Sequence, residues 1–386
     1  MPVDVVVVGA GISGAASAYE LARAGLAVTL IDRYAPAAMA SGWTLAGVRQ
    51  SGRHPTELPL ARAAVALWPS LGERLGADIF YRRDGNLRLA RTEAEVAVIE
   101  TLVRRQSEAG LPIRLLCGAG EIRTVTSAVA EEVLAASFCP TDGHADPIAT
   151  VAAYVQAAKG AGAGLRFGER VHAIETSGGR VAGVRTDRGA IAAGAVVLAA
   201  GVFGNDLLRP LGLEVPLDVH EVTVLRSAPA ERVLLPVIGV ANADCAGRQE
   251  VDGRFRATSG LLPWNGEYRE DGGRPIVHPS AASIGAVVET FGAVVPAFRR
   301  ARIEAVWAGL IDLTPDALPV LDTPGSVAGL AIAMGFSGHG FCLGPVIGQI
   351  MAALVQGEVP DLPIAPFRLA RFAVPPMRAE PVTLHG

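Results

Sequence analysis

Lysine, cysteine and aromatic side chains are scarce in this sequence, and basic residues are not in excess. Lys159 is the only lysine among the 34 basic residues, and the remainder are arginines. The formal net charge is -4 at pH 7, so the chain lacks the positive charge that binding to nucleic acid requires. We therefore expect no nucleic-acid partner.

The four cysteines are too scattered to form a recognisable site. Cys117, Cys139, Cys245 and Cys342 include no Cys-x-x-Cys pair, which argues against a zinc site and against a disulfide framework. We therefore predict no bound metal and a reducing compartment. The first sequence motif begins almost at Met1, so we expect no signal peptide and a cytoplasmic protein.

One segment lacks charge altogether and invites a membrane interpretation. Residues 323–356 contain no Asp, Glu, Lys or Arg. Gly, Pro, Ser, His and Gln interrupt the segment throughout, so it has no clean apolar run of membrane-spanning length. We expect a deeply buried strand, loop and helix there, and no transmembrane span.

The start of the chain contains a dinucleotide-binding pattern. The β-branched run Val5–Val8 predicts a parallel strand buried on both faces. Gly9, Gly11 and Gly14 follow with G-x-G-x-x-G spacing, which permits a tight turn, close approach of a pyrophosphate and close helix packing. The helix predicted over Ala15–Ala24 directs its N-terminal N–H groups at the phosphates.

A second strand and its terminal acid complete this pattern. Residues 27–31 predict a strand, and Asp32 at its end is placed to accept hydrogen bonds from ribose hydroxyls. Because all parts stand at the required spacing, we predict a bound adenine dinucleotide. The pattern alone does not distinguish FAD from NAD.

Residues 59–160 predict mainly helices. We expect these helices at 59–75, 92–109 and 148–160. Thr92 is the predicted N-cap of the second, with Glu95 at the capping-box position. Residues 79–89 predict a β-hairpin that turns at Asp84-Gly85-Asn86.

The second half of the chain predicts mainly strands. Residues 195–200 form an apolar run that ends in Ala-Ala-Gly, and residues 217–298 alternate as in an antiparallel sheet. Trp264 and Tyr268 within that sheet serve either as a cover for a ligand or as ordinary core. The remaining expected elements are strands at 303–311 and 330–334 and a helix that begins at Pro345.

Three segments together resemble one family of enzymes. They are the N-terminal fingerprint, the loop SGWTLAGVRQ (41–50), and LTPDALPVLD (313–322) with GFSGHGFCLGP (335–345). With VVLAAG at 196–201, they are similar to the D-amino-acid oxidase, glycine oxidase and sarcosine oxidase superfamily of FAD enzymes over nearly the whole chain. AGVRQ and GHGF look most like the β subunits of heteromeric sarcosine oxidases and of proline, hydroxyproline and opine dehydrogenases.

The resemblance implies a bound FAD and a division of the chain into two domains. The fold class is α/β: a Rossmann-like FAD-binding domain (1–77, 141–216 and 300–386) joined to an α+β substrate-binding domain with a split antiparallel sheet (78–140 and 217–299). The residues implied in FAD binding are Gly9, Gly11, Ile12, Ser13, Gly14, Asp32, Arg33, Ser41, Gly42, Ala46, Gly47, Val48, Val171, Ala200, Gly201, Gly309, Gly335, Phe336, Gly338, His339, Gly340 and Phe341.

The sequence departs from the family pattern in two ways. Some sarcosine oxidases attach the flavin through a cysteine just before the TPD motif, whereas residues 307–312 contain no cysteine. We therefore expect non-covalent FAD. Monomeric sarcosine oxidases also place a lysine over the flavin that promotes reaction with oxygen, and Lys159, in a predicted helix, should instead be solvated.

The implied reaction is oxidation of a C–N bond. A hydride passes from the substrate carbon to flavin N5, and water hydrolyses the resulting imine. Arg49 is the first candidate to hold the substrate carboxylate in a bidentate clamp, with Arg53 and His54 in the same loop as further basic residues. His339 and Tyr268 are the other candidate catalytic residues, although a packed histidine that orders the glycine-rich loop fits equally well.

The substrate and the partners stay open at this point. The substrate class is proline, hydroxyproline, sarcosine, an opine or a D-amino acid. We expect a dehydrogenase that is the catalytic subunit of a hetero-oligomer, with partner subunits that carry a second redox cofactor. The alternatives are a stand-alone oxidase that produces hydrogen peroxide, a non-catalytic FAD-bearing electron-relay subunit, and an NAD-dependent dehydrogenase.

Overall fold

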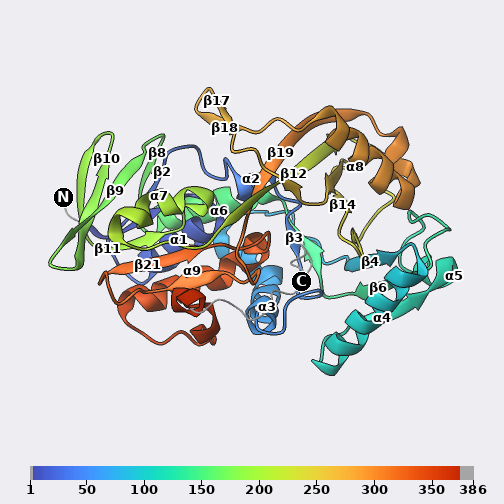
Figure 1. Cartoon of the computed structure of the whole chain (residues 1–386), viewed down its shortest axis with the longest axis horizontal. Coiled ribbons are helices and arrows are strands. Elements are labelled where there is room, and N and C mark those ends of the chain that lie inside the picture. The colour runs from blue at the N-terminus through green and yellow to red at the C-terminus, as the bar shows by residue number, and fades with distance from the viewer. Residues whose placement is uncertain (1–2, 374–386) are drawn as a thin grey trace.

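The computed structural model describes residues 3–373, which contain two large β-sheets. In Figure 1 the strands of the first sheet, among them β2, β8, β11 and β21, occupy the left half of the molecule. Elements of the second sheet and its helices, among them β4, β6, β14, α4 and α8, occupy the right half. The predicted mixed α/β architecture is confirmed.

The first sheet has eight strands, and parallel strands form its centre. Its path is β20-β21-β11-β1-β2-β8, and the hairpin of β9 and β10 is attached to β11. The strands from β21 to β8 pair in parallel, whereas β20 is antiparallel. Their bounds are β1 (Val3–Val8), β2 (Val28–Asp32), β8 (Gly164–Phe167), β9 (Val171–Ser177), β10 (Arg180–Thr186), β11 (Gly189–Leu198), β20 (Val320–Asp322) and β21 (Leu330–Met334).

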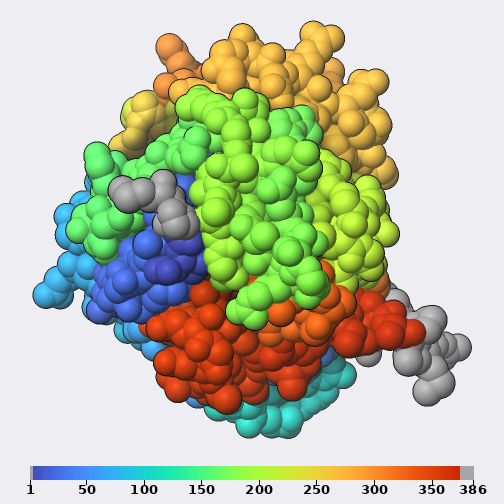
Figure 2. Space-filling model, turned by 90° about the vertical axis from the view of Figure 1, so that its left-hand side faces the viewer, coloured from blue at the N-terminus to red at the C-terminus, as the bar shows by residue number. Residues whose placement is uncertain are grey.

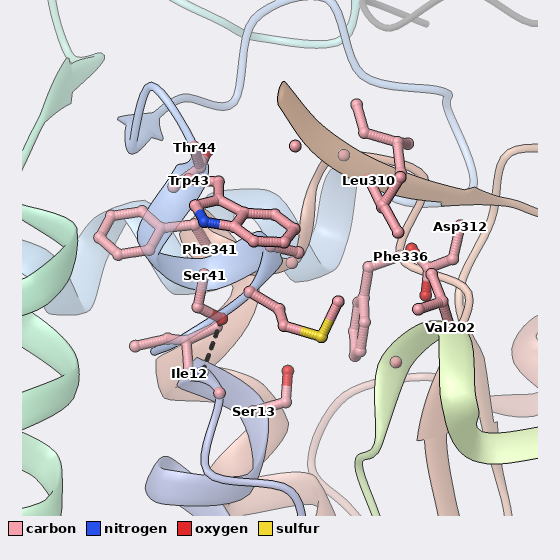
Figure 3. A pocket seen from close by; sticks show the side chains of 18 of the residues that line it. Ile12, Ser13, Ser41, Trp43, Thr44, Val202, Leu310, Asp312, Phe336 and Phe341 are labelled. Carbon is pink, nitrogen blue, oxygen red and sulfur yellow. Dashed lines mark hydrogen bonds between the residues drawn. The ribbon is translucent and has the colours of Figure 1, made fainter. Parts of the chain in front are cut away.

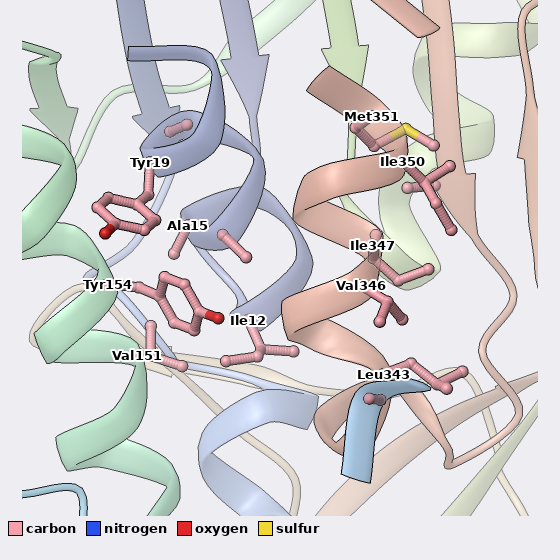
Figure 4. Close-up of a cluster of buried hydrophobic side chains, with 14 of the residues drawn as sticks. Ile12, Ala15, Tyr19, Val151, Tyr154, Leu343, Val346, Ile347, Ile350 and Met351 are labelled. Carbon is pink, nitrogen blue, oxygen red and sulfur yellow. The ribbon is translucent and has the colours of Figure 1, made fainter. Parts of the chain in front are cut away.

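Helix α1 (Ile12–Arg23) is packed between two other helices. On one side it contacts α6 (Pro147–Gly160), and on the other α9 (Gly340–Gln356). Figure 4 shows Tyr19 beside Tyr154, and the side chains of Val346, Ile347, Ile350 and Met351 in a row along α9. A fully buried aliphatic side chain such as Ile347 stabilises the fold by about 1.5–3 kcal/mol.

The close contact of α1 with α9 depends on small residues. A Cβ on Gly348 would lie 2.8 Å from the carbonyl carbon of Ala16, so the two backbones meet with no room for a side chain. Helix α3 (Leu58–Leu75), as predicted at 59–75, also packs on α9. Together these helices fix the position of the N-terminal end of α1, where the dinucleotide was expected.

The predicted start of the last helix was wrong. Helix α9 begins at Gly340, and Pro345 lies inside it. A proline lacks the N–H that an interior helical position donates, but the loss of one hydrogen bond does not outweigh the burial of almost every side chain from Phe341 to Met351. The glycine-rich loop is therefore shorter, and the N-terminus of α9 lies closer to its glycines.

The second sheet has nine strands and is mostly antiparallel. Its path is β16-β12-β15-β14-β13-β4-β6-β5, and β19 pairs with β12. Strands β4 and β13 pair in parallel. The bounds are β4 (Asn86–Ala90), β5 (Arg114–Cys117), β6 (Ala135–Cys139), β12 (Asp218–Ser227), β13 (Val237–Val240), β14 (Cys245–Gln249), β15 (Phe255–Ser259), β16 (Leu262–Pro263) and β19 (Ile303–Leu313).

The hairpin predicted at 79–89 is absent from the described chain. Only Asn86–Ala90 forms a strand, and its partners β6 and β13 are distant in sequence. Gly85 does adopt a turn conformation, with φ of 88°, but the chain before it bonds elsewhere: the N–H of Arg82 donates to the carbonyl of His144. Asn86, expected in the turn, is instead the first residue of β4, so both the predicted turn and its pairing partner were wrong.

Helix α8 (Ala281–Val294) lies within residues 217–298, where only strands were predicted. Ser280 caps it by accepting a hydrogen bond from the N–H of Ser283. Its apolar side packs on the sheet through residues such as Val287 and Phe291. By contrast, α4 (Glu93–Glu108) and its Thr92 cap, which accepts from the N–H of Glu95, are confirmed.

Smaller elements connect these layers. Strands β3 (Gly47–Val48) and β7 (Gly143–His144) form one two-stranded sheet, and β17 (Arg269–Asp271) and β18 (Arg274–Ile276) form another. The short helices are α2 (Ala40–Trp43), α5 (Gly118–Ile122) and α7 (Gly204–Leu208), with 3₁₀ turns at Gly201–Phe203, Arg209–Leu211, Pro296–Arg300, Ala365–Phe367 and Leu369–Ala373.

The first sheet and its helices come from separate parts of the sequence. On the face shown in Figure 2, N-terminal, central and C-terminal segments lie side by side in blue, green and red. The expected division at residue 300 cuts β19 away from β12, to which it is hydrogen-bonded along its whole length. We therefore propose that the domain boundary follows the sheets, with β19 in the second domain.

Within residues 3–373, no helix is both long enough and apolar enough to cross a membrane. The uncharged segment 323–356 forms the buried strand β21, a loop and α9, as predicted.

Candidate functional site

The main cavity lies between the carboxyl ends of the parallel strands and one face of the second sheet. Its walls include Gly9 and Ile31 at the ends of β1 and β2, and Val222 and Ile238 from the second sheet. In open α/β sheets, ligands bind at the carboxyl edge of the strands. Figure 3 shows Ser13, Ser41, Trp43, Leu310 and Phe336 around this space.

The glycine turn brings three backbone segments into close contact. A Cβ on Gly14 would lie 1.8 Å from the carbonyl oxygen of Gly9, and a Cβ on Gly9 would lie 2.3 Å from that of Ala199. Gly9 also has φ of 106°, in the region that favours glycine. No side chain fits at either position, so the backbone at the N-terminal end of α1 stays open to a ligand.

The end of β2 is held by its acid. Asp32 accepts hydrogen bonds from the N–H groups of Ala10 (2.6 Å) and Tyr34 (2.8 Å). Burial raises the pKa of its carboxyl, while these two N–H groups and Arg33 oppose that rise. Asp32 lines the cavity and has lone pairs left for ribose hydroxyls.

Aromatic and small residues form the other walls of this end. The guanidinium of Arg33 lies 4.3 Å from the centre of the Phe203 ring. Ser41 accepts a hydrogen bond from the N–H of Ile12 (2.9 Å), which ties α2 to α1, as drawn in Figure 3. A Cβ on Gly309 would lie 3.1 Å from the Cβ of Trp43, so β19 lies directly against α2.

The loop before α9 is fixed by Asp312. Its Oδ2 accepts a hydrogen bond from the N–H of Gly335 (3.0 Å), and its carbonyl accepts from the N–H of Ser337 (3.2 Å). Burial raises the pKa of the Asp312 carboxyl to about 6. This contact places the N-terminal end of α9 at the cavity wall, where Gly338, Gly340 and Phe341 line it.

Arg49 is the best-placed cation at the opposite end of the cavity. Its Nη1 donates to the carbonyls of Ser51 (2.6 Å) and Gly52 (3.2 Å), and its Nη2 lies 3.5 Å from Nε2 of His339. Burial, with the neighbouring charges of Arg53 and Arg88, lowers its pKa to about 9. The two carbonyl oxygens orient the guanidinium, and Arg49 lines the cavity.

His339 lies behind Arg49 and does not line the cavity. Its Nδ1 is 2.9 Å from Oε2 of Glu57, which is also 3.4 Å from Nη1 of Arg53. Burial and the charge of Arg53 lower the pKa of His339. Burial alone would raise the pKa of Glu57, but the surrounding positive charge outweighs burial and lowers this pKa. In the neutral imidazole with the proton on Nδ1, the Nε2 lone pair faces Arg49.

A second buried acid holds the Arg49 loop in place. Asp142 accepts hydrogen bonds from the N–H groups of Gln50 (2.9 Å) and Ser51 (3.2 Å) and from the Ser51 hydroxyl. The thiol of Cys342 lies 3.4 Å from the carbonyl of Arg49. The loop that carries Arg49 is therefore attached to both α9 and the 139–146 segment.

Most residues predicted for the site do line the cavity. These are Gly9, Gly11, Ile12, Ser13, Asp32, Arg33, Ser41, Gly47, Arg49, Val171, Ala200, Gly201, Gly309, Phe336, Gly338, Gly340 and Phe341. Other predicted residues support the walls without forming them: Gly14, Gly42, Ala46, Val48, Gly335 and His339. Ala46 has positive φ (55°) and Gly335 has φ of 66°, which shapes the two loops.

Tyr268 does not lie near Arg49. Its ring packs on Phe203 with centroids 5.6 Å apart, and it adjoins Tyr34, at the end of the cavity that holds Asp32 and Arg33. The structure thus brings Arg49 and His339 together and separates Tyr268 from them. Arg53 is buried against Glu57, whereas His54 is exposed.

Sequence reasoning missed the wall contributed by the second sheet. Asn86, Arg88, Ser137 and Ile238 line the cavity, as does Trp43 of α2. One signal was present: in NLRLA the leucines alternate with Asn86 and Arg88, so the two sets must face opposite sides of a strand. Which side faces the ligand was not decidable without the pairing of β4.

The site fits a flavin dinucleotide. The glycine cradle at α1, the acid at the end of β2 and a long slot with apolar walls offer the phosphate, ribose and ring contacts that such a cofactor needs. Within the described chain, no cluster of His, Cys, Asp and Glu is arranged to hold a metal ion. Fold and site together define a dinucleotide-dependent oxidoreductase.

The family assignment makes this class specific. Residues 4–354 match the profile of the family described as DAO, FAD dependent oxidoreductase, and the chain belongs to this family. The cofactor is therefore FAD, and the NAD alternative is excluded. The predicted enzyme class is confirmed.

Individual relatives extend over almost the whole chain. It is 27% identical to sarcosine oxidase subunit beta of Arthrobacter sp, over 96% of this chain and 91% of that one. It is 29% identical to 4-methylaminobutanoate oxidase (formaldehyde-forming) of Paenarthrobacter nicotinovorans, over 96% of this chain but only 46% of that longer protein. The crystal structure of L-proline dehydrogenase from P. horikoshii superposes with a TM-score of 0.88 at 26% identity, covering 96% and 98% of the two chains.

Proposed function

We propose that this chain oxidises the C–N bond of an amino acid or secondary amine that carries a carboxylate. The observation that carries the proposal is Arg49, a buried guanidinium that lines the cavity and is oriented by the carbonyls of Ser51 and Gly52. The names of the three relatives given above support it, since each is an oxidase or dehydrogenase named for an amine or an amino acid.

The residues of the chain bind and orient the substrate. FAD, when bound, supplies the acceptor for the hydride that leaves the substrate carbon, and water then hydrolyses the imine product. Arg49 holds the carboxylate and so fixes which substrate carbon faces the cofactor. His339 and Glu57 are positioning residues, because they act on Arg49 rather than on the substrate.

The start of α9 contributes electrostatic stabilisation. The backbone between Gly338 and Phe341 lines the cavity at the N-terminal end of this helix. Its N–H groups and the helix dipole favour negative charge, which develops on the cofactor as it is reduced. Asp312 holds this loop through the N–H of Gly335.

We further propose that FAD is held without a covalent bond. Of the cysteines in the described chain, only Cys245 lines the cavity, from the second sheet, and Cys342 is buried against the Arg49 carbonyl. Acid precipitation should release all the flavin into the supernatant. Flavin that remains in the pellet would contradict the proposal.

We propose that the chain works as a dehydrogenase within a hetero-oligomer, although the alternative of a stand-alone oxidase shares the same site. Lys159 is exposed on α6 and does not line the cavity, so no lysine is placed to stabilise superoxide beside reduced flavin. The similarity to a sarcosine oxidase subunit beta supports the hetero-oligomer. Slow reoxidation by oxygen with fast reoxidation by an artificial acceptor would support the dehydrogenase.

The decisive experiment is anaerobic reduction of the bound flavin by a panel of substrates. Sarcosine, proline, hydroxyprolines, D-amino acids and opines are mixed in turn with the holoprotein, and bleaching of the flavin absorption is followed. At least one of them should reduce the flavin. If none does, the chain is the non-catalytic electron-relay subunit instead.

A further inference from the structure

A second arginine reaches the cavity from the floor of the second sheet. Arg88 lies in the middle of β4, where the side chains of Leu87 and Leu89 face the apolar core beneath α8. Because side chains alternate along a strand, Arg88 points the other way and lines the cavity. Its relative exposure is only 8%, so this charge is largely removed from water.

Other arginines on the same sheet face have evident structural partners. Arg248 donates to the carbonyls of Leu45 and Ala145, and Arg256 donates to the carbonyl of Thr44 at 2.7 Å. Both also lie near Glu250, with N–O distances of 3.7 Å for Arg248 and 2.8 Å for Arg256. These two side chains tie the second sheet to the cofactor domain.

Arg88 has no such partner among residues 3–373. No described side chain or carbonyl accepts a hydrogen bond from its guanidinium, and no carboxylate lies within ion-pair distance of it. Burial alone lowers its pKa, to about 10. Buried charges are normally paired because leaving one unpaired is costly, so a position like this one calls for an anionic ligand.

The neighbouring acids are already engaged. Asp142 is bonded to the Gln50–Ser51 backbone, and Glu57 faces Arg53 and His339. Neither of these two carboxylates is within ion-pair distance of Arg88. A substrate carboxylate would supply the negative charge that Arg88 lacks among the described residues.

Arg88 and Arg49 lie close enough to influence each other, since the charge of Arg88 contributes to the lowered pKa of Arg49. The space beside Arg88 is open on the β13 side, where its neighbour is Gly239, and polar on the β6 side, where its neighbour is Ser137. Both neighbours line the cavity. The five N–H donors of Arg88 are therefore available to an anion in this corner.

We infer that Arg88 binds the substrate carboxylate jointly with Arg49. The inference rests on the proposed function, and it assigns the substrate-binding role to β4 as well as to the loop of Arg49. Nη1 of Arg49 already donates to two carbonyls, so Arg88 offers more N–H donors to the carboxylate than Arg49 does. A single carboxylate shared by two guanidiniums replaces the repulsion between them with two attractive contacts.

The test compares Arg88→Met and Arg88→Lys with Arg114→Met, a matched control at an exposed arginine of the same sheet. Anaerobic stopped-flow reduction gives the apparent substrate Kd and the limiting rate separately. Arg88→Met should raise Kd about 100-fold with FAD content unchanged. Arg88→Lys should recover part of the loss, and Arg114→Met should behave as wild type. An unchanged Kd in both Arg88 variants would overturn the inference.

A second readout does not depend on catalysis. Acetate, which has a carboxylate but no oxidisable amine, should perturb the flavin absorption of the wild-type holoprotein and bind much more weakly to Arg88→Met and, to a smaller degree, to Arg88→Lys. If both Arg88→Lys and Arg88→Met bind acetate with the same affinity as wild type, the inference is overturned. If wild type binds acetate but no amine reduces the flavin, the proposed function fails while the anion site stands.

The substrate panel also separates a shared carboxylate from a second one. Binding of one carboxylate by both arginines predicts the same loss for monocarboxylic and dicarboxylic amines in Arg88→Met. A loss confined to dicarboxylic substrates would place Arg88 at a different group of the substrate and would overturn the shared-carboxylate inference.

Discussion

The two ends of the cavity are built in opposite ways. At the cofactor end, one continuous segment, from Gly9 to Asp32, forms much of the wall. Its backbone segments are so close together at Gly9 and Gly14 that no side chain fits there. At the other end, which we propose binds the substrate and call the substrate end, charged side chains from a loop and from a distant strand, Arg49 and Arg88, line the same cavity. The cofactor end therefore tolerates no added atoms, whereas the substrate end depends on which charge is present.

The largest effect is expected at the cofactor end. Gly14→Val places atoms where even a Cβ would lie 1.8 Å from the Gly9 carbonyl oxygen, and this backbone contact has no room to relax. We predict a protein purified without flavin, measured by the ratio of visible to ultraviolet absorption. Gly285→Ala, in α8 with open space around it, is the control and should retain FAD; flavin bound normally by Gly14→Val would contradict the account.

Arg49→Lys changes the substrate end and leaves the cofactor end intact. Lysine keeps the charge but loses the fork that binds a carboxylate at two points. Loss of charge-assisted hydrogen bonds worth about 1.5–3 kcal/mol should slow flavin reduction at low substrate by about 10- to 100-fold, with FAD content unchanged. Stopped-flow reduction that matches wild type would remove Arg49 from the substrate site.

The pH dependence of stability should also distinguish the two ends. The lowered pKa of His339 means that the unfolded chain binds more protons than the folded one as the pH falls below about 6.5. This contribution to stability is therefore lost on acidification, and the lowered pKa of Glu57 adds to the loss below about 4.5. Melting temperatures of His339→Gln should accordingly fall less steeply with decreasing pH than those of wild type.

Asp312, beside the cofactor, should change stability with pH in the opposite direction to His339. Its pKa is raised to about 6, so the folded state binds more protons than the unfolded one between about 3.8 and 6. Stability from this group is lost as the pH rises through that interval. The melting temperature of Asp312→Asn should therefore fall more steeply on acidification than that of wild type. Parallel curves of melting temperature against pH for Asp312→Asn and His339→Gln would contradict both assignments.

The smallest predicted effect is a gain in stability. Arg88→Met replaces an unpaired buried charge with an apolar side chain of similar length, which removes a desolvation cost. We expect the melting temperature without substrate to rise by about 2–4 °C, corresponding to about 1 kcal/mol. A fall in melting temperature would show that Arg88 has a structural partner after all.

The same contrast explains how much of the molecule the sequence could predict. The strands and helix around Gly9 and the cap at Thr92 depend on neighbouring residues, and each was predicted correctly. The hairpin at 79–89 was wrong because β4 pairs with residues far away in the chain. Helix α8 was missed because its small and β-branched residues are also compatible with a strand.

The candidate site follows the same rule. Arg49 lies in a motif that resembles a known family, so the sequence predicted its role, which stays a proposal. Arg88 lies in an ordinary strand, and its place in the cavity depends on the register of β4 with β6 and β13. Such long-range pairing cannot be predicted from the residues near Arg88 in a single sequence.

The central claim is that the substrate end of the cavity recognises a carboxylate next to an oxidisable C–N bond. The most direct measurement is anaerobic flavin reduction by proline against pyrrolidine, and by sarcosine against dimethylamine. For whichever pair is active, we predict that the carboxylated amine reduces the flavin at least about 30-fold more efficiently, because loss of a buried charge pair costs about 2–5 kcal/mol. Equal reduction by both members of the pair would contradict the account.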